Sequence, residues 1–120
     1  MDKSIENLVK DLMDNHRRQY LNVRDSTLIK VVLESLRKTF PTAQVNRVTV
    51  NKNNRLDWHK HPNQGSVSYG LLFGDFKGGE LVHSKGVECD KGKWFSFDGT
   101  EDHRVNDFIG DRYSVVAYDR

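Results

Sequence analysis

Residues 112–118 read Arg-Tyr-Ser-Val-Val-Ala-Tyr, and this run has the period of two that is typical of a β-strand. Successive side chains of a strand point to opposite faces of a sheet, so Arg112 and Ser114 share one face. Gly110-Asp111 stands before the run as a turn. The sequence therefore predicts a long strand near the end of the chain that carries a guanidinium on one of its faces.

The same alternation extends back to about residue 42. Runs rich in β-branched and aromatic residues are separated by short segments that contain Gly, Pro, Asn or Asp, which favour turns, among them Gly74–Gly79. Many short strands at such spacing indicate a β-sandwich or a small barrel. The predicted strands are Val45–Val50, Arg55–His59, Ser66–Phe73, Glu80–His83, Lys93–Phe97, His103–Val105 and Arg112–Tyr118.

Before Pro41 the apolar period changes to that of a helix. Apolar residues recur there at steps of three and four, which predicts two amphipathic helices. Asp25 or Ser26 can cap the second helix, and Pro41 ends it. We therefore predict an α+β fold in one domain, residues 1–120, with a helical buttress in 1–41 and an antiparallel β-barrel core in 42–120.

The bulk composition excludes some classes of protein. The formal net charge is only +2, which gives no indication of a polyanionic partner, and the single cysteine, Cys89, allows no intrachain disulfide. There is no long apolar run, and the first residues lack the apolar core of a signal peptide. We expect a protein without a membrane partner, located in the cytoplasm or another reducing intracellular compartment.

Three of the five histidines have a spacing that suits a metal. His59 and His61 are two residues apart, so on a strand both imidazoles point to one side. His103 follows a turn and begins another predicted strand, from which it can supply a third ligand. Two ligands from one strand and one from a distant strand leave half of the coordination sphere open, as in the facial sites of non-haem Fe(II) oxygenases.

Arg112 is the second candidate for a site residue. A guanidinium that points inward among apolar neighbours is costly unless it meets an anion, and its planar fork matches a carboxylate. Ser114, two residues on, can add a hydrogen bond to the same anion. The alternative is a surface ion pair with one of the many acidic residues.

These residues together resemble the Fe(II)/2-oxoglutarate dioxygenase superfamily. The superfamily's order is a His-x-Asp pair, a distal His and an Arg-x-Ser, which here is His59-Lys60-His61, then His103, then Arg112-Tyr113-Ser114. The resemblance implies a double-stranded β-helix (jelly-roll) that binds Fe(II), 2-oxoglutarate and O₂ and hydroxylates a C–H bond. Asn51 in Asn51-Lys52-Asn53 resembles an asparagine that helps to hold the cosubstrate.

The segment from His59 to Leu81 is most similar to the thymine and 5-methylcytosine dioxygenases, the base J-binding-protein and ten-eleven-translocation group. That resemblance suggests a nucleobase substrate. Basic residues with aromatics near them in sequence could track a nucleic-acid strand and stack a base, although a solvated charged face and core aromatics are the plainer interpretation. The residues are His16, Arg17, Arg18, Lys52, Arg55 and Lys60 with Trp58, Tyr69 and Trp94.

One departure from the superfamily pattern keeps alternatives open, because His61 stands where the family has Asp. Three neutral imidazoles also suit Zn(II) or Ni(II). Asp57 could replace the lost carboxylate, although a step of two residues along the strand, about 6.6 Å, makes that reach awkward. The other functions left open are a catalytically silent binding module and a cupin-like three-histidine metalloprotein that uses no oxo acid.

Overall fold

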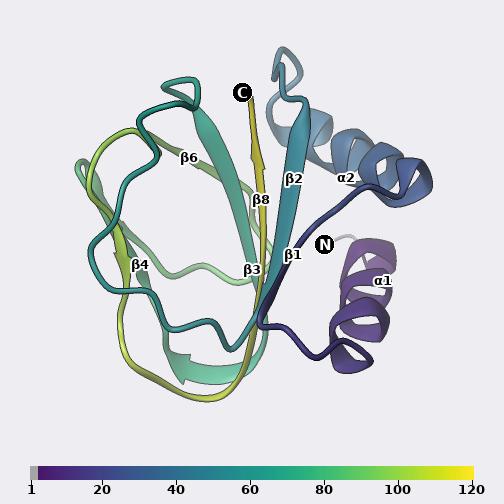
Figure 1. Ribbon diagram of the computed structural model, residues 1–120, viewed down its shortest axis with the longest axis horizontal. Helices are drawn as coiled ribbons and strands as arrows, with labels where there is room; N and C mark the ends of the chain where they lie inside the picture. The colour runs from purple at the N-terminus through teal and green to yellow at the C-terminus, as the bar shows by residue number, and fades with distance from the viewer. Residues whose placement is uncertain (1–2) are drawn as a thin grey trace.

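The computed structural model describes residues 3–120 and contains two helices and two antiparallel sheets (Figure 1). The helices lie together on one side of the larger sheet, and the smaller sheet lies on its other side. The elements in chain order are α1 Lys3–Asp14, β1 Tyr20–Asn22, α2 Ser26–Thr39, β2 Arg47–Lys52, β3 Ser68–Gly78, β4 Leu81–His83, β5 Gly86–Glu88, β6 Phe95–Phe97, β7 Arg104–Val105 and β8 Phe108–Tyr118.

The larger sheet has the strand order β1-β2-β8-β3-β6, and the smaller one has the order β5-β4-β7. The last strand, β8, lies at the centre of the larger sheet, where it pairs with β2 from Arg47↔Tyr118 to Lys52↔Tyr113 and with β3 from Tyr69↔Ala117 to Gly78↔Phe108. A central strand is flanked on both sides, so its alternating side chains define the two faces of the sheet. The two predicted helices and the antiparallel pairing of the strands are confirmed.

The helices begin and pack as their sequences predict. Asp25 caps α2, because its Oδ1 accepts hydrogen bonds from the amides of Thr27 at 2.8 Å and Leu28 at 3.3 Å. Phe40 ends α2 just before Pro41, which cannot continue a helix. The apolar stripes of both helices are buried against one face of the larger sheet; they are Ile5, Val9 and Met13 in α1 and Leu28, Val32 and Leu36 in α2.

The structure corrects several details of the predicted strands. The segment Arg55–His59 is not a strand, because it makes only one isolated bridge, between His59 and His103. The short strands β1 and β5 were not predicted. Within residues 3–120 the two sheets are not joined by strand pairing, so the predicted barrel is not confirmed.

The predicted turns at Gly74–Gly79 and Gly110-Asp111 were also wrong, since β3 and β8 run through them as a long paired ribbon. Gly74 has a φ of +121°, and a Cβ there would lie 2.3 Å from the carbonyl oxygen of Asp111 on the paired strand. Only glycine allows this backbone conformation and this close approach. The glycine therefore permits a bend within the strand rather than ending it.

No helix in the described part of the chain is long and apolar enough to cross a membrane.

Candidate metal centre

The three predicted histidines lie together between the two sheets. The backbones of His59 and His103 bridge each other, with N–O distances of 3.0 and 2.9 Å. The amide of His61 donates a 2.8 Å hydrogen bond to the carbonyl of Gly99, which anchors the second member of the pair. The convergence that we expected from a strand is thus produced by a single bridge and one anchored loop.

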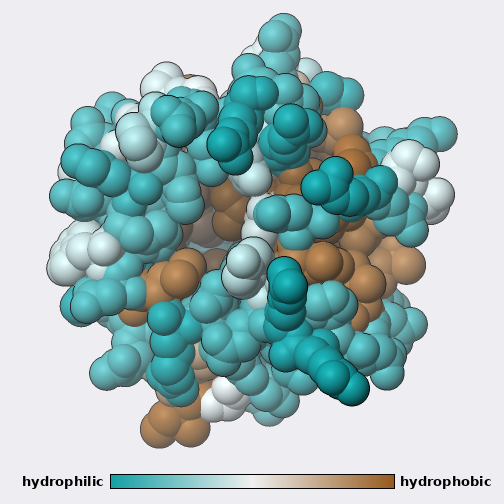
Figure 2. All heavy atoms as spheres, in the orientation of Figure 1, coloured by the Kyte–Doolittle hydropathy of each residue, from teal (hydrophilic) through white to brown (hydrophobic). Residues whose placement is uncertain are grey.

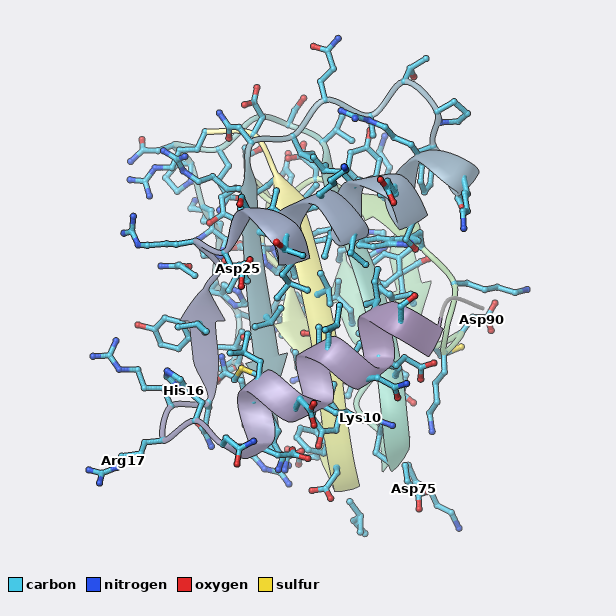
Figure 3. All side chains as sticks on the ribbon, turned by 90° about the vertical axis from the view of Figure 1, so that its right-hand side faces the viewer. Lys10, His16, Arg17, Asp25, Asp75 and Asp90 are labelled. Atoms are coloured by element: carbon cyan, nitrogen blue, oxygen red, sulfur yellow. The ribbon has the colours of Figure 1, made fainter. Side chains whose placement is uncertain are left out.

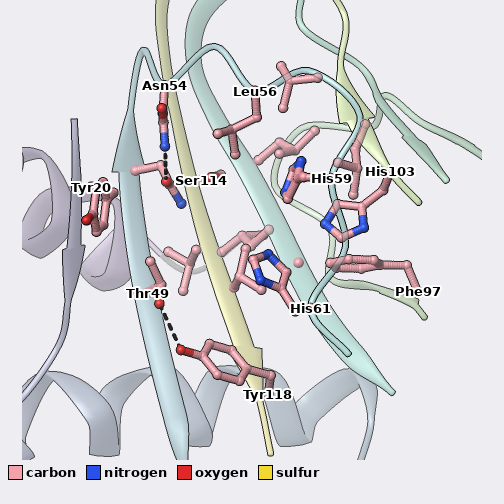
Figure 4. A pocket seen from close by; sticks show the side chains of 18 of the residues that line it. Tyr20, Thr49, Asn54, Leu56, His59, His61, Phe97, His103, Ser114 and Tyr118 are labelled. Carbon is pink, nitrogen blue, oxygen red and sulfur yellow. Dashed lines mark hydrogen bonds between the residues drawn. The ribbon is translucent and has the colours of Figure 1, made fainter. Parts of the chain in front are cut away.

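The three imidazole rings point toward one another (Figure 4). The ring centroids of His59 and His103 are 4.2 Å apart, and that of His61 lies 5.1 and 5.6 Å from them. One nitrogen from each ring lies within 4.8 Å of the other two. This spacing allows the three nitrogens to bind a single ion.

Backbone carbonyls orient two of these rings. The Nδ1 of His59 lies 2.8 Å from the carbonyl oxygen of Asp57, and the Nδ1 of His103 lies 2.8 Å from that of Glu101. A carbonyl oxygen can only accept a hydrogen bond, so each Nδ1 carries the proton and each Nε2 keeps a free lone pair. Such contacts fix the tautomer and the ring orientation of metal-binding histidines.

The environment favours the neutral form of two of the imidazoles, those of the buried His103 and the exposed His61. Burial lowers the pKa of His103, an effect that the carbonyl of Glu101 partly offsets. Burial also lowers the pKa of His61, and the neighbouring His59 and the charge of Arg120 lower it further. A neutral imidazole is the form that binds a metal.

Asp57 does not take the place of the carboxylate that the superfamily pattern has at position 61. Its Oδ1 accepts a 2.8 Å hydrogen bond from the amide of Trp58, and its side chain is exposed. Among residues 3–120 the metal-ligand group consists of the three histidines alone. The donor set is therefore all nitrogen.

Arg112 lies in the same cavity as the histidines and is only 3% exposed. Its Nε donates a 2.8 Å hydrogen bond to the carbonyl of Gly79, and within residues 3–120 it forms no ion pair. Burial lowers its pKa to about 10, which the charge of Glu80 offsets only in part. The alternative interpretation, a surface ion pair, is therefore not what the structure shows, and the guanidinium remains available to an anion.

Ser114 and Asn51 lie beside Arg112. They are directly opposite in the pairing of β8 with β2, and both are buried cavity residues. The Oδ1 of Asn51 accepts a 3.0 Å hydrogen bond from the Nδ2 of Asn54, a contact drawn in Figure 4, so the amide group of Asn51 keeps its own donors. The structure thus brings all three predicted cosubstrate residues to one end of the cavity.

The cavity has a volume of about 410 Å³ and lies between the sheets. This size is within the range of pockets that bind small molecules. Figure 2 shows a mostly hydrophilic surface with a hollow between the sheets, where apolar side chains are visible. The larger sheet gives this lining an apolar part, here called the apolar wall, with Leu72 of β3 and Phe95 and Phe97 of β6, and a polar part, the polar wall, from β1, β2 and β8.

Sequence reasoning missed part of the polar wall, namely Tyr20, Asn22, Thr49, Tyr118 and Arg120. The alternation of β8 does place Tyr118 on the face of Arg112, but β1 is only three residues long and gave no periodic signal.

The basic and aromatic residues that suggested a nucleic-acid strand do not gather at the site. Trp94 is 8% exposed and donates a hydrogen bond to Ser35 of α2, and Tyr69 packs against Phe40 on the helix side. Figure 3 shows Arg17 extending away from the body of the protein. Two of the three aromatics are therefore core residues, and only Trp58 is exposed.

No family model matches the sequence, and no curated protein is similar to it in sequence. Solved structures are similar in fold. A viral collagen prolyl hydroxylase from Paramecium bursaria Chlorella virus-1, in complex with 2OG, has a TM-score of 0.68 at 11% identity, over 98% of this chain and 89% of that one. An oxidoreductase of the 2OG-Fe(II) oxygenase family from Burkholderia pseudomallei has a TM-score of 0.61 at 14% identity, over 98% of this chain and 79% of that one. The chain therefore shares its fold with 2OG-Fe(II) oxygenase structures.

Proposed function

We propose that the chain is an Fe(II)- and 2-oxoglutarate-dependent oxygenase. His59, His61 and His103 would hold the metal, and Arg112, Ser114 and Asn51 would hold 2-oxoglutarate. The observation that carries the proposal is that one cavity contains both a cluster of three imidazoles and a buried guanidinium that forms no ion pair with any residue from 3 to 120. The fold shared with 2OG-Fe(II) oxygenase structures supports the same function.

The three histidines suit a facial iron site. Imidazole binds Fe(II) well, and three ligands on one side leave positions for a chelating oxo acid and for O₂. When bound, the iron would supply the activation of O₂, coupled to the oxidative decarboxylation of 2-oxoglutarate, that allows hydroxylation of a C–H bond. The chain's own contribution is to orient the rings of His59 and His103 and to favour the neutral form of His61 and His103.

Arg112 suits the distal carboxylate of 2-oxoglutarate. A bidentate contact between guanidinium and carboxylate is strong when both groups are removed from water. The hydroxyl of Ser114 and the amide of Asn51 lie on the adjacent positions of β8 and β2 and can donate to the same ligand. This end of the cavity argues against a cupin-like site, which would have no use for a buried cation.

The assignment to the thymine and 5-methylcytosine dioxygenase group is not part of this proposal. The aromatics that suggested base stacking lie mostly in the core, and no other contact favours a nucleobase.

The test is spectroscopic. Fe(II) is added to the protein without oxygen, followed by 2-oxoglutarate, and the visible metal-to-ligand charge-transfer band is recorded; succinate is then measured after air is admitted. We expect the band and succinate from the unaltered chain and neither from His103→Ala. Metal binding without the band would contradict the oxygenase proposal in favour of a metalloprotein that uses no oxo acid, and no metal binding would indicate a silent module.

The variant Arg112→Met distinguishes binding of the metal by the histidines from binding of 2-oxoglutarate by Arg112. We expect this variant to keep its metal affinity and to need at least about 100-fold more 2-oxoglutarate, since a lost charge-assisted contact costs about 3 kcal/mol or more. Arg17→Met, a change at an arginine that extends into solvent, serves as the matched control and should behave as the unaltered chain. Equal loss of metal and oxo acid in Arg112→Met would contradict the assigned role.

A further inference from the structure

The polar wall of the cavity continues beyond the cosubstrate end as a shelf of hydrogen-bonding groups. We define the donor shelf as Tyr20, Asn22, Thr49, Tyr118 and Arg120, all of which line the cavity. Strand pairing explains how they meet, because Asn22 of β1 lies opposite Thr49 of β2, which in turn lies opposite Val116, two residues before Tyr118 in β8. None of these groups is needed for the metal or for 2-oxoglutarate.

The hydrogen bonds within the shelf use the hydroxyl protons of Thr49 and Tyr118 and leave the amide nitrogen of the exposed Asn22 as a donor. Thr49 donates from its hydroxyl to the Oδ1 of Asn22 at 2.9 Å, and the hydroxyl of Tyr118 lies 3.3 Å from that of Thr49 (Figure 4). Since the Thr49 proton is already used, Tyr118 is the donor of the second bond. The amide nitrogen of Asn22 has no hydrogen-bond partner among residues 3–120, so its two N–H groups are available.

Arg120 adds a charge to the shelf. Its backbone is held by two hydrogen bonds with the Asn46 side chain, of 3.0 and 3.1 Å, so the position of the residue is fixed. Arg120 is exposed at the rim of the cavity, among its lining residues, and forms no ion pair with any residue of the described chain. A fixed backbone and an unpaired guanidinium suit the recognition of an anion.

The lining of the cavity carries no acidic side chain, although Glu80 lies near Arg112. The two arginines of the lining lie at opposite ends. Arg112 and Tyr118 are six residues apart on one strand, which corresponds to about 20 Å. A short oxo dicarboxylate that binds at Arg112 and at the histidines leaves this other end of the cavity to a different molecule.

We propose that the donor shelf is the substrate subsite and that it selects a small organic carboxylate, which Arg120 and Asn22 bind by its anionic group. The apolar wall of Leu72, Phe95 and Phe97 would pack against the hydrocarbon part of that substrate. This inference rests on the proposed oxygenase function, because it assigns the other end of the cavity to 2-oxoglutarate. The uncharged remainder of the substrate then presents its C–H bond between the shelf and the histidines.

The test measures binding rather than turnover. Protein loaded with Fe(II) and saturating 2-oxoglutarate, without oxygen, is titrated calorimetrically with 3-phenylpropanoate, with phenyl phosphate and with the neutral analogue 3-phenylpropanamide. We expect the carboxylate to bind at least about tenfold more tightly than the amide, and this preference to weaken as salt is added because an exposed arginine is screened. Tighter binding of the phosphate than of the carboxylate would overturn the choice of a carboxylate.

Variants test which residues cause the preference for the carboxylate over the amide. Arg120→Gln and Asn22→Ala should each remove most of the preference for the carboxylate over the amide, while Arg17→Gln, which makes the same change of charge away from the cavity, should leave it unaltered. The charge-transfer band with 2-oxoglutarate should persist in all three variants. Carboxylate binding that is unchanged in Arg120→Gln would refute the subsite, and loss of the band in that variant would show that Arg120 serves 2-oxoglutarate instead. Absence of the band from the unaltered chain would refute the oxygenase function itself.

Discussion

The two faces of the larger sheet are made by the same strands and have opposite characters. The face under the helices is filled by apolar side chains such as Val50, Phe73 and Val115, all 1% exposed or less. The other face of the same strands carries Asn51, Arg112 and Ser114, which are buried but polar. Alternation alone separates the two sets. The comparison shows that one face is apolar and stabilises the fold, while the other buries polar groups at a cost in stability; under the proposed function these groups bind a ligand.

Phe73→Ala is expected to have the largest effect on stability. Phe73 is 1% exposed and stacks on Tyr113 with ring centroids 5.5 Å apart, so its removal leaves a cavity under the helices. We expect the free energy of unfolding to fall by about 3–5 kcal/mol, measured by urea denaturation. Phe95→Ala makes the same change on the cavity face, where the ring already borders open space, and should cost less than half as much. Equal losses of unfolding free energy in the two variants would contradict the distinction between the two faces of the sheet.

The sequence predicts most of this division but not all of it. The alternation in residues 112–118 correctly separates the buried guanidinium from the core side chains, and the spacing of the histidines correctly suggests that they meet. The residues that alternation cannot predict depend on tertiary contacts. The three-residue strand β1 exists only because it pairs with β2, and the region around His59 is held by a bridge to a residue far along the chain.

The glycine-containing segments were the other place where the prediction from sequence was wrong. Segments 74–79 and 110–111 have the composition of turns, and turn propensity is a local property. Here the glycines allow two long strands to stay paired while they bend. If Gly74 had a Cβ, that atom would lie only 2.3 Å from the backbone of the partner strand. Only the paired strand shows why a glycine is needed at such a position, so the sequence of one strand cannot distinguish a bend from a turn.

Arg112→Met tests the other face of the sheet, and we expect its effect on the free energy of unfolding to be opposite in sign to that of Phe73→Ala. The unpaired guanidinium costs desolvation energy, and its replacement by an apolar side chain of similar length is expected to leave stability unchanged or to raise it by up to about 2 kcal/mol. The lost hydrogen bond to Gly79 offsets part of the gain. Thermal unfolding checks the prediction, since 2-oxoglutarate should raise the Tm of the metal-loaded original chain and not that of the variant. A strongly destabilised variant would show that Arg112 is a structural residue.

Asp14→Asn is expected to have the smallest effect, although Asp14 connects α1 to the sheet. Hydrogen bonds from Lys52 at 2.8 Å and from Tyr113 at 2.5 Å lower the pKa of the Asp14 carboxyl below its usual 3.8. The side chain is 48% exposed, so solvent screening limits the stabilisation to about 0.5 kcal/mol.

A lowered pKa fixes the direction of the pH dependence for this last variant. The stabilisation by ionised Asp14 is fully present above the unfolded pKa and is lost as the pH falls through the folded value. Urea denaturation should therefore show a small difference in the free energy of unfolding between the original chain and Asp14→Asn at pH 7, which shrinks as the pH falls below 3.8 and through the lowered folded pKa. A difference that grows in acid would mean that the carboxyl is destabilised in the fold. The Asp14 carboxyl on the helix face would then destabilise the fold, as the buried Arg112 is expected to do on the opposite face. The contrast between the two faces would no longer hold.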